Sequence, residues 1–402
     1  MKIIITGGDG FCGWPTSLHL SNLGHNVLII DNLSRRSIAS ALQYESLTEI
    51  NAIHNRIAKW RELTGQEILF YNLDIAHDYA PLKEVVSSYN PDCIVHLAAQ
   101  RSAPYSMMTV EAGNYTLSNN VLSANNVLRA IEQHDRTIKL VHLGSIGVYG
   151  YEDRAFEIPE GHTEFSSVDS NNVEYKVQGQ IPLNPTSIYH LSKSQITSLL
   201  NFYSQNYAIN ITDLYQGIVW GTQTTETRMS SELSNRFDYD EIYGTVLNRF
   251  VVQAQAGMPI SVYGKGMQTR AFIHIQDTVK CIETAVISPA ANNSEVEVMH
   301  QISETRTVKS VADHVANLMN AKIKQVVNPR DEEEEHRYIL ANTKFKALGM
   351  NRLNTLGDNL LDEIQNVVSK NLHRIDQSCI APKVKWGKVV EKQPAERERI
   401  AS

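Results

Sequence analysis

The stretch MKIIITGGDGFCGWPTS, residues 1–17, decides the fold class of this chain. The run KIIIT (residues 2–6) has the length and the β-branched content of a buried strand, and it leads directly into glycines at positions 7, 10 and 13. Glycines at this spacing let the backbone turn tightly and approach a diphosphate at the N-terminus of the next helix. The stretch therefore predicts the first strand–turn–helix unit of a dinucleotide-binding domain, and the turn that binds the cofactor consists of Gly7, Gly10, Phe11, Cys12 and Gly13.

Further apolar runs of strand length alternate with helix-like stretches through the first half of the chain. These runs are NVLIID (26–31), EILFYNLD (67–74), DCIVHLAA (92–99), KLVHLGSI (139–146) and INITDLYQGIVWG (209–221). Nearly continuous apolar runs are typical of strands in a parallel sheet whose two faces are both covered by helices. We therefore expect an α/β fold with a Rossmann doubly wound parallel sheet, formed by residues 1–150 and completed by about 186–217 and 270–290.

The remaining segments are less regular and predict a smaller, discontinuous α/β C-terminal domain for a substrate. It consists of about 151–185, 218–269 and 291–376, and the polar first segment suggests loops with a hairpin. Residues 34–65 are long for one crossover, and we expect them to be mostly helical. The charged and aperiodic end, residues 381–402, predicts a flexible tail.

The composition narrows the class of protein. A chain of 402 residues with 42% hydrophobic and 20% charged residues is an ordinary soluble globular protein, and its net charge of −7 argues against nucleic acid as the main partner. The four cysteines form no CxxC pair, which fits reduced thiols in a reducing compartment. No segment nears the ~18 apolar residues of a membrane span, so we expect a cytoplasmic protein or an organelle protein after processing.

Two groups of polar residues carry no predicted role. The acidic run Asp331 to Glu335, followed by His336, is interpreted as a solvated face or a clamp on Arg330, because five adjacent acids cannot all point at one ion. No metal site is expected. His96 and His142 lie within buried strand patterns and are interpreted as core histidines.

Asp31, at the end of the second predicted strand, favours NAD as the cofactor. A carboxylate at this position accepts both ribose hydroxyl protons of an adenosine and repels a 2′-phosphate. Asn32 and Arg35 follow it, although arginines just after this strand can also bind that phosphate. After the third strand, Asp74 and Ile75 are expected beside the adenine, and Asp74 could instead cap the helix that starts near His77.

Ser145, Tyr189 and Lys193 are the predicted catalytic residues. Tyr189 and Lys193 are four positions apart in IYHLSK and so share one face of a helix. A tyrosine with a pKa near 10 is a poor base at neutral pH, but a nearby ammonium stabilises its phenolate. Ser145, which ends the strand KLVHLGS, would hold the same substrate hydroxyl while Tyr189 deprotonates it and a hydride leaves its carbon for NAD.

These motifs together resemble one family. The combination of TGGDGFCG, Asp31, HLAAQ, Ser145 and Tyr189-xxx-Lys193 is similar to the extended short-chain dehydrogenases of the NAD-dependent epimerase/dehydratase family, which modify nucleotide sugars. Longer stretches resemble the UDP-sulfoquinovose synthase branch of that family. They are DGFCGWPTSLHL (9–20), QRSAPYSMM (100–108), NRFDYDEIYGTVLNRF (235–250), YGKGMQTRAFIHI (263–275) and NPRDEEEEH (328–336).

The resemblance implies a tightly held NAD that oxidises C4 of UDP-glucose, dehydration across C5 and C6, addition of sulfite, and re-reduction at C4. It adds Leu97, Ala98, Ala99, Asn120, Tyr189, Lys193 and Gln216 to the cofactor-binding residues. It assigns the sugar nucleotide to Arg101, Ser145, His190, Gln216, Thr245, Arg249, Gln268, Arg270 and Arg330. It also implies a homodimer formed through the helices that begin near Pro104 and Ile188.

The chain departs from that branch at two positions. Sulfoquinovose synthases usually carry a glutamate where this sequence has Val148, in GSIGVYG, and Ala99, in AAQRSAP. Elimination of water needs a base for the C5 proton and an acid for the leaving oxygen. The stretch GSIGVYG is similar to that of 4-epimerases, so a UDP-hexose 4-epimerase is the enzymatic alternative, and a non-catalytic NAD-sensing scaffold is the alternative of another class.

Overall fold

The computed structural model describes residues 1–152, 156–289, 294–330, 335–337, 339–357 and 361–385. Within these residues the large sheet has seven strands, all parallel, in the order β13-β9-β5-β4-β1-β2-β3. The strands are β1 (Lys2–Thr6), β2 (Asn26–Asp31), β3 (Ile68–Asn72), β4 (Cys93–His96), β5 (Lys139–Ser145), β9 (Ile211–Gln216) and β13 (Glu297–Gln301). The strand order reverses between β1 and β4, as in a Rossmann fold, which confirms the predicted fold class.

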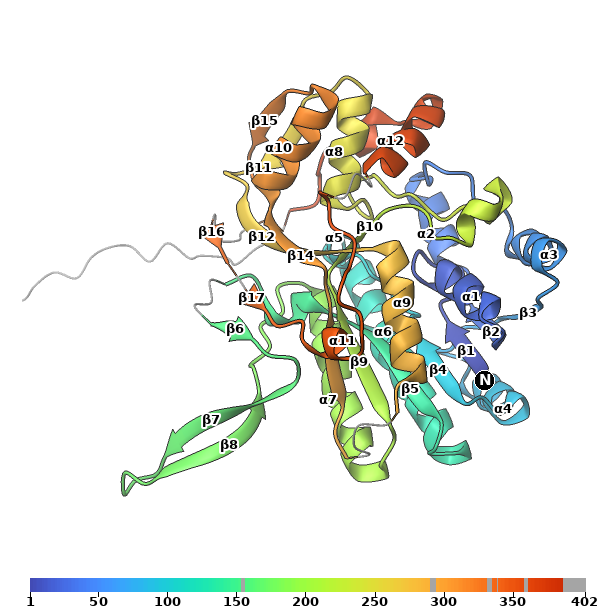
Figure 1. The fold of residues 1–402 in the computed structure, drawn as a ribbon, viewed down its shortest axis with the longest axis vertical. Coiled ribbons are helices and arrows are strands. Elements are labelled where there is room, and N and C mark those ends of the chain that lie inside the picture. Colours follow the sequence, from blue (N-terminus) through green and yellow to red (C-terminus); the bar gives the residue numbers. More distant parts are fainter. Residues whose placement is uncertain (153–155, 290–293, 331–334, 338, 358–360, 386–402) are drawn as a thin grey trace, which may run out of the picture.

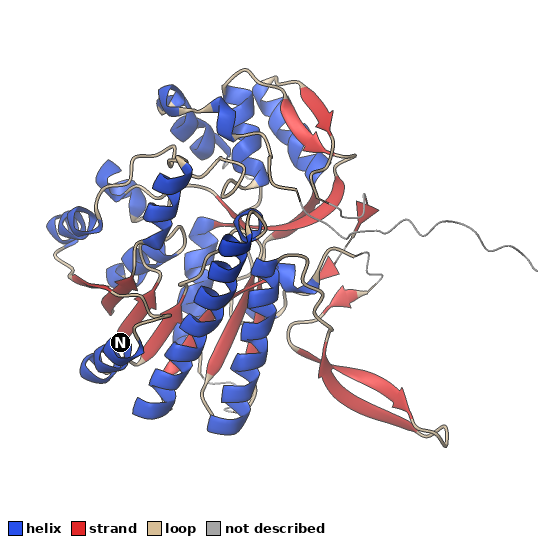
Figure 2. Ribbon diagram, turned by 180° about the vertical axis from the view of Figure 1, so that it is seen from behind, coloured by secondary structure: helices blue, strands red, loops and turns tan. Residues whose placement is uncertain are grey.

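Helices cover both faces of this sheet (Figures 1 and 2). On one face α4, α6 and α7 enclose a core that includes Val86, Leu128 and Leu200, and on the other face α1 and α9 enclose a core that includes Leu18 and Ile282. These helices are α1 (Gly13–Asn22), α4 (Tyr79–Tyr89), α6 (Val110–His134), α7 (Ile188–Tyr207) and α9 (Ile275–Ile287). Because both faces are covered, the strands lack polar alternation, which is why their sequences are continuously apolar.

The long segment before β3 forms two helices, as the sequence predicts. They are α2 (Ser34–Leu42) and α3 (Ile53–Thr64). Trp60 of α3 is fully buried and donates its indole N–H to Ser21 Oγ at 3.0 Å. Arg56 of the same helix reaches Asp9 Oδ1 at 3.0 Å and the carbonyl of Ser234 at 3.1 Å, so the segment braces the glycine turn against a distant part of the chain.

The smaller domain has its own core, in which Phe250, Phe272 and Ile364 are buried. Its mixed sheet contains β10 (Ile218–Trp220), β12 (Met267–His274), β14 (Glu304–Thr307) and β16 (Glu335–His336), and a second pair joins β11 (Ile260–Tyr263) to β15 (Ile323–Val326). Helices α8 (Val246–Gln255), α10 (Val308–Met319) and α12 (Leu361–Lys370) pack around them. The predicted hairpin is β7 (His162–Val168) paired with β8 (Glu174–Gln180), which projects from the body (Figure 1).

The remaining elements are short. They are β6 (Glu157–Ile158), which pairs with β17 (Ile339–Leu340), the helices α5 (Ala103–Ser106) and α11 (Lys344–Ala347), and the 3₁₀ turns η1 (Ile146–Tyr149), η2 (Thr227–Met229), η3 (Ser231–Leu233), η4 (Leu372–Arg374) and η5 (Gln377–Cys379).

Three details differ from the sequence-based division. The strand β13 lies in the range 291–376, which was expected in the smaller domain, yet it pairs with β9 at the edge of the large sheet. The run INITDLYQGIVWG is two strands, because the chain leaves the large sheet after Gln216 and enters the smaller one at Ile218. The helix expected near Pro104 is the single turn α5, and the long helix α6 starts at Val110. From residue 386 on, the predicted flexible tail lies outside the described residues.

Candidate active site

The glycine turn lies where the strand order reverses. Gly7 has a φ of +75°, and a Cβ there would lie 2.7 Å from the backbone N of Ala98, so the turns after β1 and β4 meet without room for a side chain. Cys12 precedes α1 and gives it no side-chain cap. Trp14 N–H donates to the carbonyl of Gly10 at 3.0 Å, and Pro15 has no N–H, so among the first three residues of α1 only Gly13 has an N–H without a partner in the described structure. This N–H at the helix N-terminus can bind a diphosphate. Residues 97–99, expected to bind the cofactor, are the partly exposed chain that follows β4.

Asp31 is held at the end of β2 by the neighbouring backbone. Its Oδ2 accepts a hydrogen bond from the N–H of Asp9 at 2.9 Å, and its Oδ1 accepts one from the N–H of Leu33 at 2.7 Å. Burial raises the pKa of Asp31 to about 6, and the backbone hydrogen bond from Asp9 opposes that rise. The carboxylate thus lies at the position where an adenosine ribose meets the second strand of a Rossmann fold.

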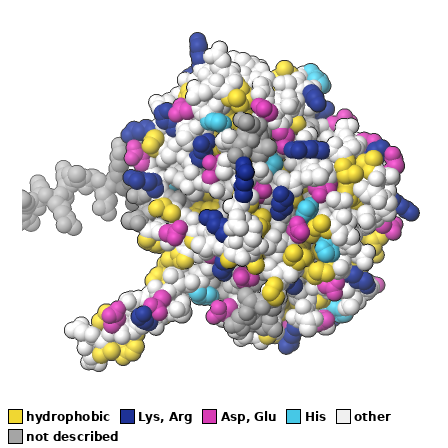
Figure 3. All heavy atoms as spheres, viewed as in Figure 1, with side chains coloured by type: hydrophobic (Ala, Val, Ile, Leu, Met, Phe, Trp, Pro, Cys, Tyr) yellow, Lys and Arg dark blue, Asp and Glu magenta, His cyan; other side chains and the backbone are white. Residues whose placement is uncertain are grey.

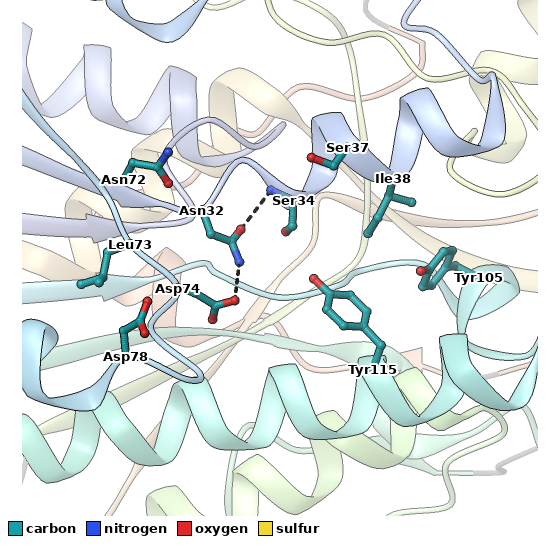
Figure 4. A pocket seen from close by; sticks show the side chains of 10 residues that line it. All are labelled: Asn32, Ser34, Ser37, Ile38, Asn72, Leu73, Asp74, Asp78, Tyr105 and Tyr115. Atoms are coloured by element: carbon teal, nitrogen blue, oxygen red, sulfur yellow. Dashed lines mark hydrogen bonds between the residues drawn. The ribbon is translucent and has the colours of Figure 1, made fainter.

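A cavity of about 500 Å³ opens beside this strand end (Figure 4). Asn32 and Asp74, both predicted to bind the cofactor, line it, and Asn32 Nδ2 donates to Asp74 Oδ2 at 3.2 Å. Asp74 Oδ1 accepts the N–H of Ala76, so this carboxylate also orders the turn before α4. Tyr105 and Tyr115 line the same cavity and were missed, because nothing near them in the sequence marks a ligand.

The two arginines after β2 are both engaged by carboxylates. Arg36 makes a bidentate pair with Asp9, with distances of 2.6 and 2.7 Å. Arg35 donates to Asp238 at 3.0 Å, and its guanidinium lies 3.5 Å from the ring centroid of Tyr243. Neither guanidinium is presented to the cavity beside Asn32, which favours NAD over a cofactor with a 2′-phosphate.

Two predicted cofactor residues are buried under the site. The side chain of Ile75 belongs to the core between the sheet and its helices. Asn120 is fully buried and connects the Gln100 loop to α7: its Nδ2 donates to the carbonyl of Gln100 and to Ser192 Oγ, each at 3.0 Å. In this structure both residues support the chain around the cofactor crevice.

The predicted catalytic residues come together from β5 and α7. Ser145 ends β5, and its Oγ accepts the N–H of Gly147 at 3.1 Å. Tyr189 lies in the first turn of α7, and it lines the same cavity as Ser145. Lys193, one turn later, donates to the carbonyl of Leu143 at 2.6 Å. Burial raises the pKa of Tyr189 to about 12, whereas the Ser145 hydrogen bond and the charge of Arg101 lower it.

A second cavity of about 730 Å³ lies between the large sheet and the smaller domain. All the residues predicted to bind the sugar nucleotide line it. The predicted residues on its walls are Phe11, Cys12, Arg101, Ser145, Tyr189, His190, Gln216, Thr245, Arg249, Gln268, Arg270 and Arg330. Residues from Phe11, which follows β1, to Arg330, which follows β15, therefore converge on one cavity together with Ser145 and Tyr189.

The charge on these walls is positive. Among the described lining residues are four arginines, at 101, 249, 270 and 330, against the two carboxylates of Glu152 and Asp238. Asp238 is already paired with Arg101 at 2.6 Å. Burial, together with the charges of Arg330 and Arg270, lowers the pKa of His190 to about 3, so its ring is neutral at neutral pH. The cavity is thus suited to a ligand that carries phosphates.

The two positions that lack the expected glutamates lie outside this cavity. Val148 is fully buried in the core, and neither Val148 nor Ala99 lines the cavity. Tyr151 and Glu152, which sequence reasoning did not single out, do line it. Tyr151 lies with its ring centroid 5.8 Å from that of His190 and 4.4 Å from the guanidinium carbon of Arg270. Both residues begin the polar insertion after β5, which has no periodic pattern in the sequence. Their contacts with the cavity form only in the folded protein.

Cys12, Cys93, Cys281 and Cys379 all lie in the described part of the chain and are free thiols. Asp331 to Glu334 lie outside the described residues. In the part of the chain that the structure describes, no helix is both long enough and apolar enough to span a membrane.

Comparison with a protein-family model supports this interpretation of the site. A model of the NAD dependent epimerase/dehydratase family matches residues 3–299, and the chain belongs to this family. It is therefore an enzyme that uses NAD, as the sequence predicted.

Within the family the chain is similar to UDP-sulfoquinovose synthases. It is 42% identical to the chloroplastic UDP-sulfoquinovose synthase of Spinacia oleracea over 393 residues, which cover 96% of this chain and 80% of the relative. It is 36% identical to the UDP-sulfoquinovose synthase of Sulfolobus acidocaldarius over 400 residues, covering 96% and 98%. The fold resembles that of UDP-glucose 4-epimerase from Thermotoga maritima, with a TM-score of 0.64, 20% identity, and coverage of 93% of this chain and 99% of that one.

Proposed function

We propose that this enzyme modifies a UDP-hexose through transient oxidation at C4 and that it acts as a UDP-sulfoquinovose synthase. One observation carries the proposal: Ser145 and Tyr189 line the same cavity, whose described walls also carry four arginines. The similarity to two UDP-sulfoquinovose synthases over 96% of the chain supports the same substrate class.

In this proposal the arginines bind the substrate, and the hydroxyl groups of Ser145 and Tyr189 carry out the chemistry. Arg101, Arg249, Arg270 and Arg330 bind the diphosphate, because a guanidinium meets phosphate oxygens bidentately. Gln216, Thr245 and Gln268 supply further hydrogen bonds to the sugar nucleotide from the same walls.

Ser145 orients the sugar hydroxyl, and Tyr189 takes its proton. Bound NAD supplies the acceptor for the hydride that leaves C4. Tyr189 requires stabilisation of its phenolate, since burial raises its pKa. Lys193, on the same face of α7, provides positive charge for that purpose. His190 lies beside Tyr189, with ring centroids 5.2 Å apart, and lines the same cavity.

A UDP-hexose 4-epimerase is the second candidate. It is favoured by the lining of the cavity, where the described carboxylates are Asp238, paired with arginines, and Glu152, which accepts a hydrogen bond from Asn184 Nδ2 at 2.5 Å. Epimerisation needs no additional acid and base at C5 and C6, so this lining suffices for it.

Incubation of the purified enzyme with UDP-glucose, with and without sulfite, separates these reactions. Mass spectrometry should detect a product heavier by the sulfonate only when sulfite is present. Conversion to UDP-galactose without sulfite would replace the synthase by the epimerase. If no nucleotide sugar reacts and NAD controls binding to a protein partner, the scaffold alternative holds.

We also propose a homodimer in the cytoplasm. The long helices α6 and α7 lie side by side on the outer face of the large sheet (Figure 2), and Leu122 and Phe202 on them are 41% and 50% exposed. Two such pairs would form a four-helix interface. The free thiols fit a reducing compartment. Light scattering should give twice the 45.2 kDa mass of the chain, and a monomer would contradict the dimer.

A further inference from the structure

A chain of buried polar contacts leads from Lys193 into the large sheet. Lys193 Nζ lies 3.3 Å from His142 Nε2, and His142 Nδ1 lies 2.7 Å from Asp213 Oδ1. The three residues come from α7, β5 and β9, and His142 and Asp213 face each other in the register of the paired strands. Their side chains are 1% and 0% exposed. The sequence had marked His142 only as a core histidine.

The direction of these hydrogen bonds follows from their donors. A lysine ammonium can only donate, so His142 Nε2 must accept from Lys193 and cannot carry a proton itself. The proton of the neutral imidazole is then on Nδ1, from which it is donated to Asp213. Burial together with the charge of Lys193 holds the pKa of His142 far below its usual range, which agrees with a neutral ring.

The charges of Lys193 and Asp213, at the two ends of this hydrogen-bonded chain, depend on each other. Burial lowers the pKa of Lys193 and raises the pKa of Asp213, and the opposite charge of each partner counters the shift. Asp213 Oδ2 has no hydrogen-bond partner among the described residues. A buried carboxylate with an unpaired oxygen is costly unless a cation balances it. Residue 144 must be glycine here, because a Cβ would lie 2.6 Å from Asp213 Oδ1.

We propose that His142 and Asp213 are positioning residues that hold Lys193 and set its charge during the reaction. The inference rests on the proposed function, in which Lys193 stabilises the Tyr189 phenolate. With Lys193 charged and Asp213 ionised, the buried chain is neutral overall. The carboxylate, acting through the imidazole, keeps the ammonium protonated next to a tyrosine that must lose its proton.

The neighbours of His142 offer a matched control. The titratable groups that face it are Asp213 from β9, Lys193 from α7 and His96 from β4, and Tyr215 lies beside Asp213 on β9. The His96 ring stacks on His142 with centroids 5.7 Å apart, and it makes one buried hydrogen bond, to Thr6 Oγ1 at 2.7 Å, but the structure gives it none to Lys193. Replacement of His96 therefore removes a buried imidazole without breaking the chain to Lys193.

The first test compares steady-state turnover of Asp213→Asn and His142→Leu with that of His96→Leu, each with bound NAD content as the check on folding. Activity that requires protonated Lys193 declines as the pH rises through the pKa of Lys193. Loss of the Asp213 charge lowers that pKa, so the alkaline limb of the kcat profile should move down by about one pH unit or more. We expect kcat at pH 8 to fall about tenfold in both chain variants, with KM little changed, whereas His96→Leu keeps its profile. Unshifted profiles in Asp213→Asn, or equal losses in all three variants, would overturn the proposal.

The second test does not depend on turnover. In the holoenzyme labelled with ¹⁵N-histidine, the His142 resonances are identified by their loss in His142→Leu, or in His142→Gln if the leucine variant does not fold. At pH 7 we expect a neutral ring with its proton on Nδ1. A ring with its proton on Nε2, or a cationic ring, could not accept a hydrogen bond from Lys193. Either result would refute the hydrogen-bonded chain of Lys193, His142 and Asp213. If instead the wild-type enzyme converts no nucleotide sugar while the NMR result holds, the proposed function is wrong, and the hydrogen-bonded chain of Lys193, His142 and Asp213 is still supported.

Discussion

The two halves of the candidate site are built in different ways. In the cofactor half, Asp9, Asp31 and Arg36 contact one another within 27 positions of the chain. In the sugar-nucleotide half, Arg101 meets Asp238 across 137 positions and Arg270 meets His336 across 66, and the cavity they line collects residues as distant as Phe11 and Arg330. Contacts between residues close in the sequence therefore set much of the first half, whereas the second exists only when both domains are folded and packed together.

The comparison predicts that one substitution abolishes chemistry without disturbing the cofactor half. Tyr189→Phe removes the proposed base, and kcat should fall by about 10²–10⁴-fold, with NAD still bound because the glycine turn is untouched. The measurement is turnover of UDP-glucose together with the NAD content of the purified protein. Tyr203→Phe is the matched control: it lies on the same helix, and its hydroxyl bonds Asn125 Oδ1 at 3.1 Å, so turnover should be retained. Substantial activity in Tyr189→Phe would refute its assignment.

A charge removed from the sugar-nucleotide half should weaken binding there alone. Arg249 on α8 lines the larger cavity and is largely buried. A hydrogen bond to a charged group contributes about 1.5–3 kcal/mol, so Arg249→Gln should raise KM by roughly ten- to hundredfold. Arg129→Gln on the outer surface of α6, where Arg129 pairs with Glu132, should leave KM unchanged. Equal KM values for the wild-type enzyme, Arg249→Gln and Arg129→Gln would show that Arg249 does not bind the substrate.

The cofactor half should show its own pH dependence through Asp31. Its folded pKa of about 6 means that this carboxylate is protonated at pH 5 and ionised at pH 7.5. NAD binding, measured by titration calorimetry, should weaken roughly tenfold at the lower pH because a charged acceptor is lost, and Asp31→Asn should remove that dependence. The effect on stability has the opposite sign: since folding raises this pKa, the contribution of Asp31 is present at low pH and is lost as the pH rises through about 6.

The smallest effect is expected outside both halves. The hairpin of β7 and β8 projects from the body (Figure 3), and its Val177 is 48% exposed. Val177→Ser should change the free energy of unfolding by less than about 0.5 kcal/mol. Leu247→Ala, at a fully buried position in α8, should cost about 2–5 kcal/mol. A large loss of stability in Val177→Ser would show that the hairpin packs against a partner.

The same contrast explains what could be predicted from the sequence. The parallel sheet, the glycine turn and Asp31 follow from short apolar runs and glycine spacing, because parallel strands and helix N-termini impose those patterns locally. The lining by Tyr151 and Glu152, and the contact between His142 and Lys193, have no local pattern, since they depend on the register of β5 with β9 and on how α7 packs over the sheet. Val148 shows the converse: the resemblance drew attention to this position, where sulfoquinovose synthases usually carry a glutamate, but in this structure its side chain is buried in the core.

Transient oxidation at C4 is the central claim, and the fate of the hydrogen on that carbon tests it most directly. UDP-glucose carrying deuterium at C4 would be converted by the enzyme, with and without sulfite, and the product analysed by mass spectrometry. Removal of the deuteride to bound NAD and its return to the same carbon predict a product that keeps the label. A product that has lost the deuterium to solvent would contradict that account.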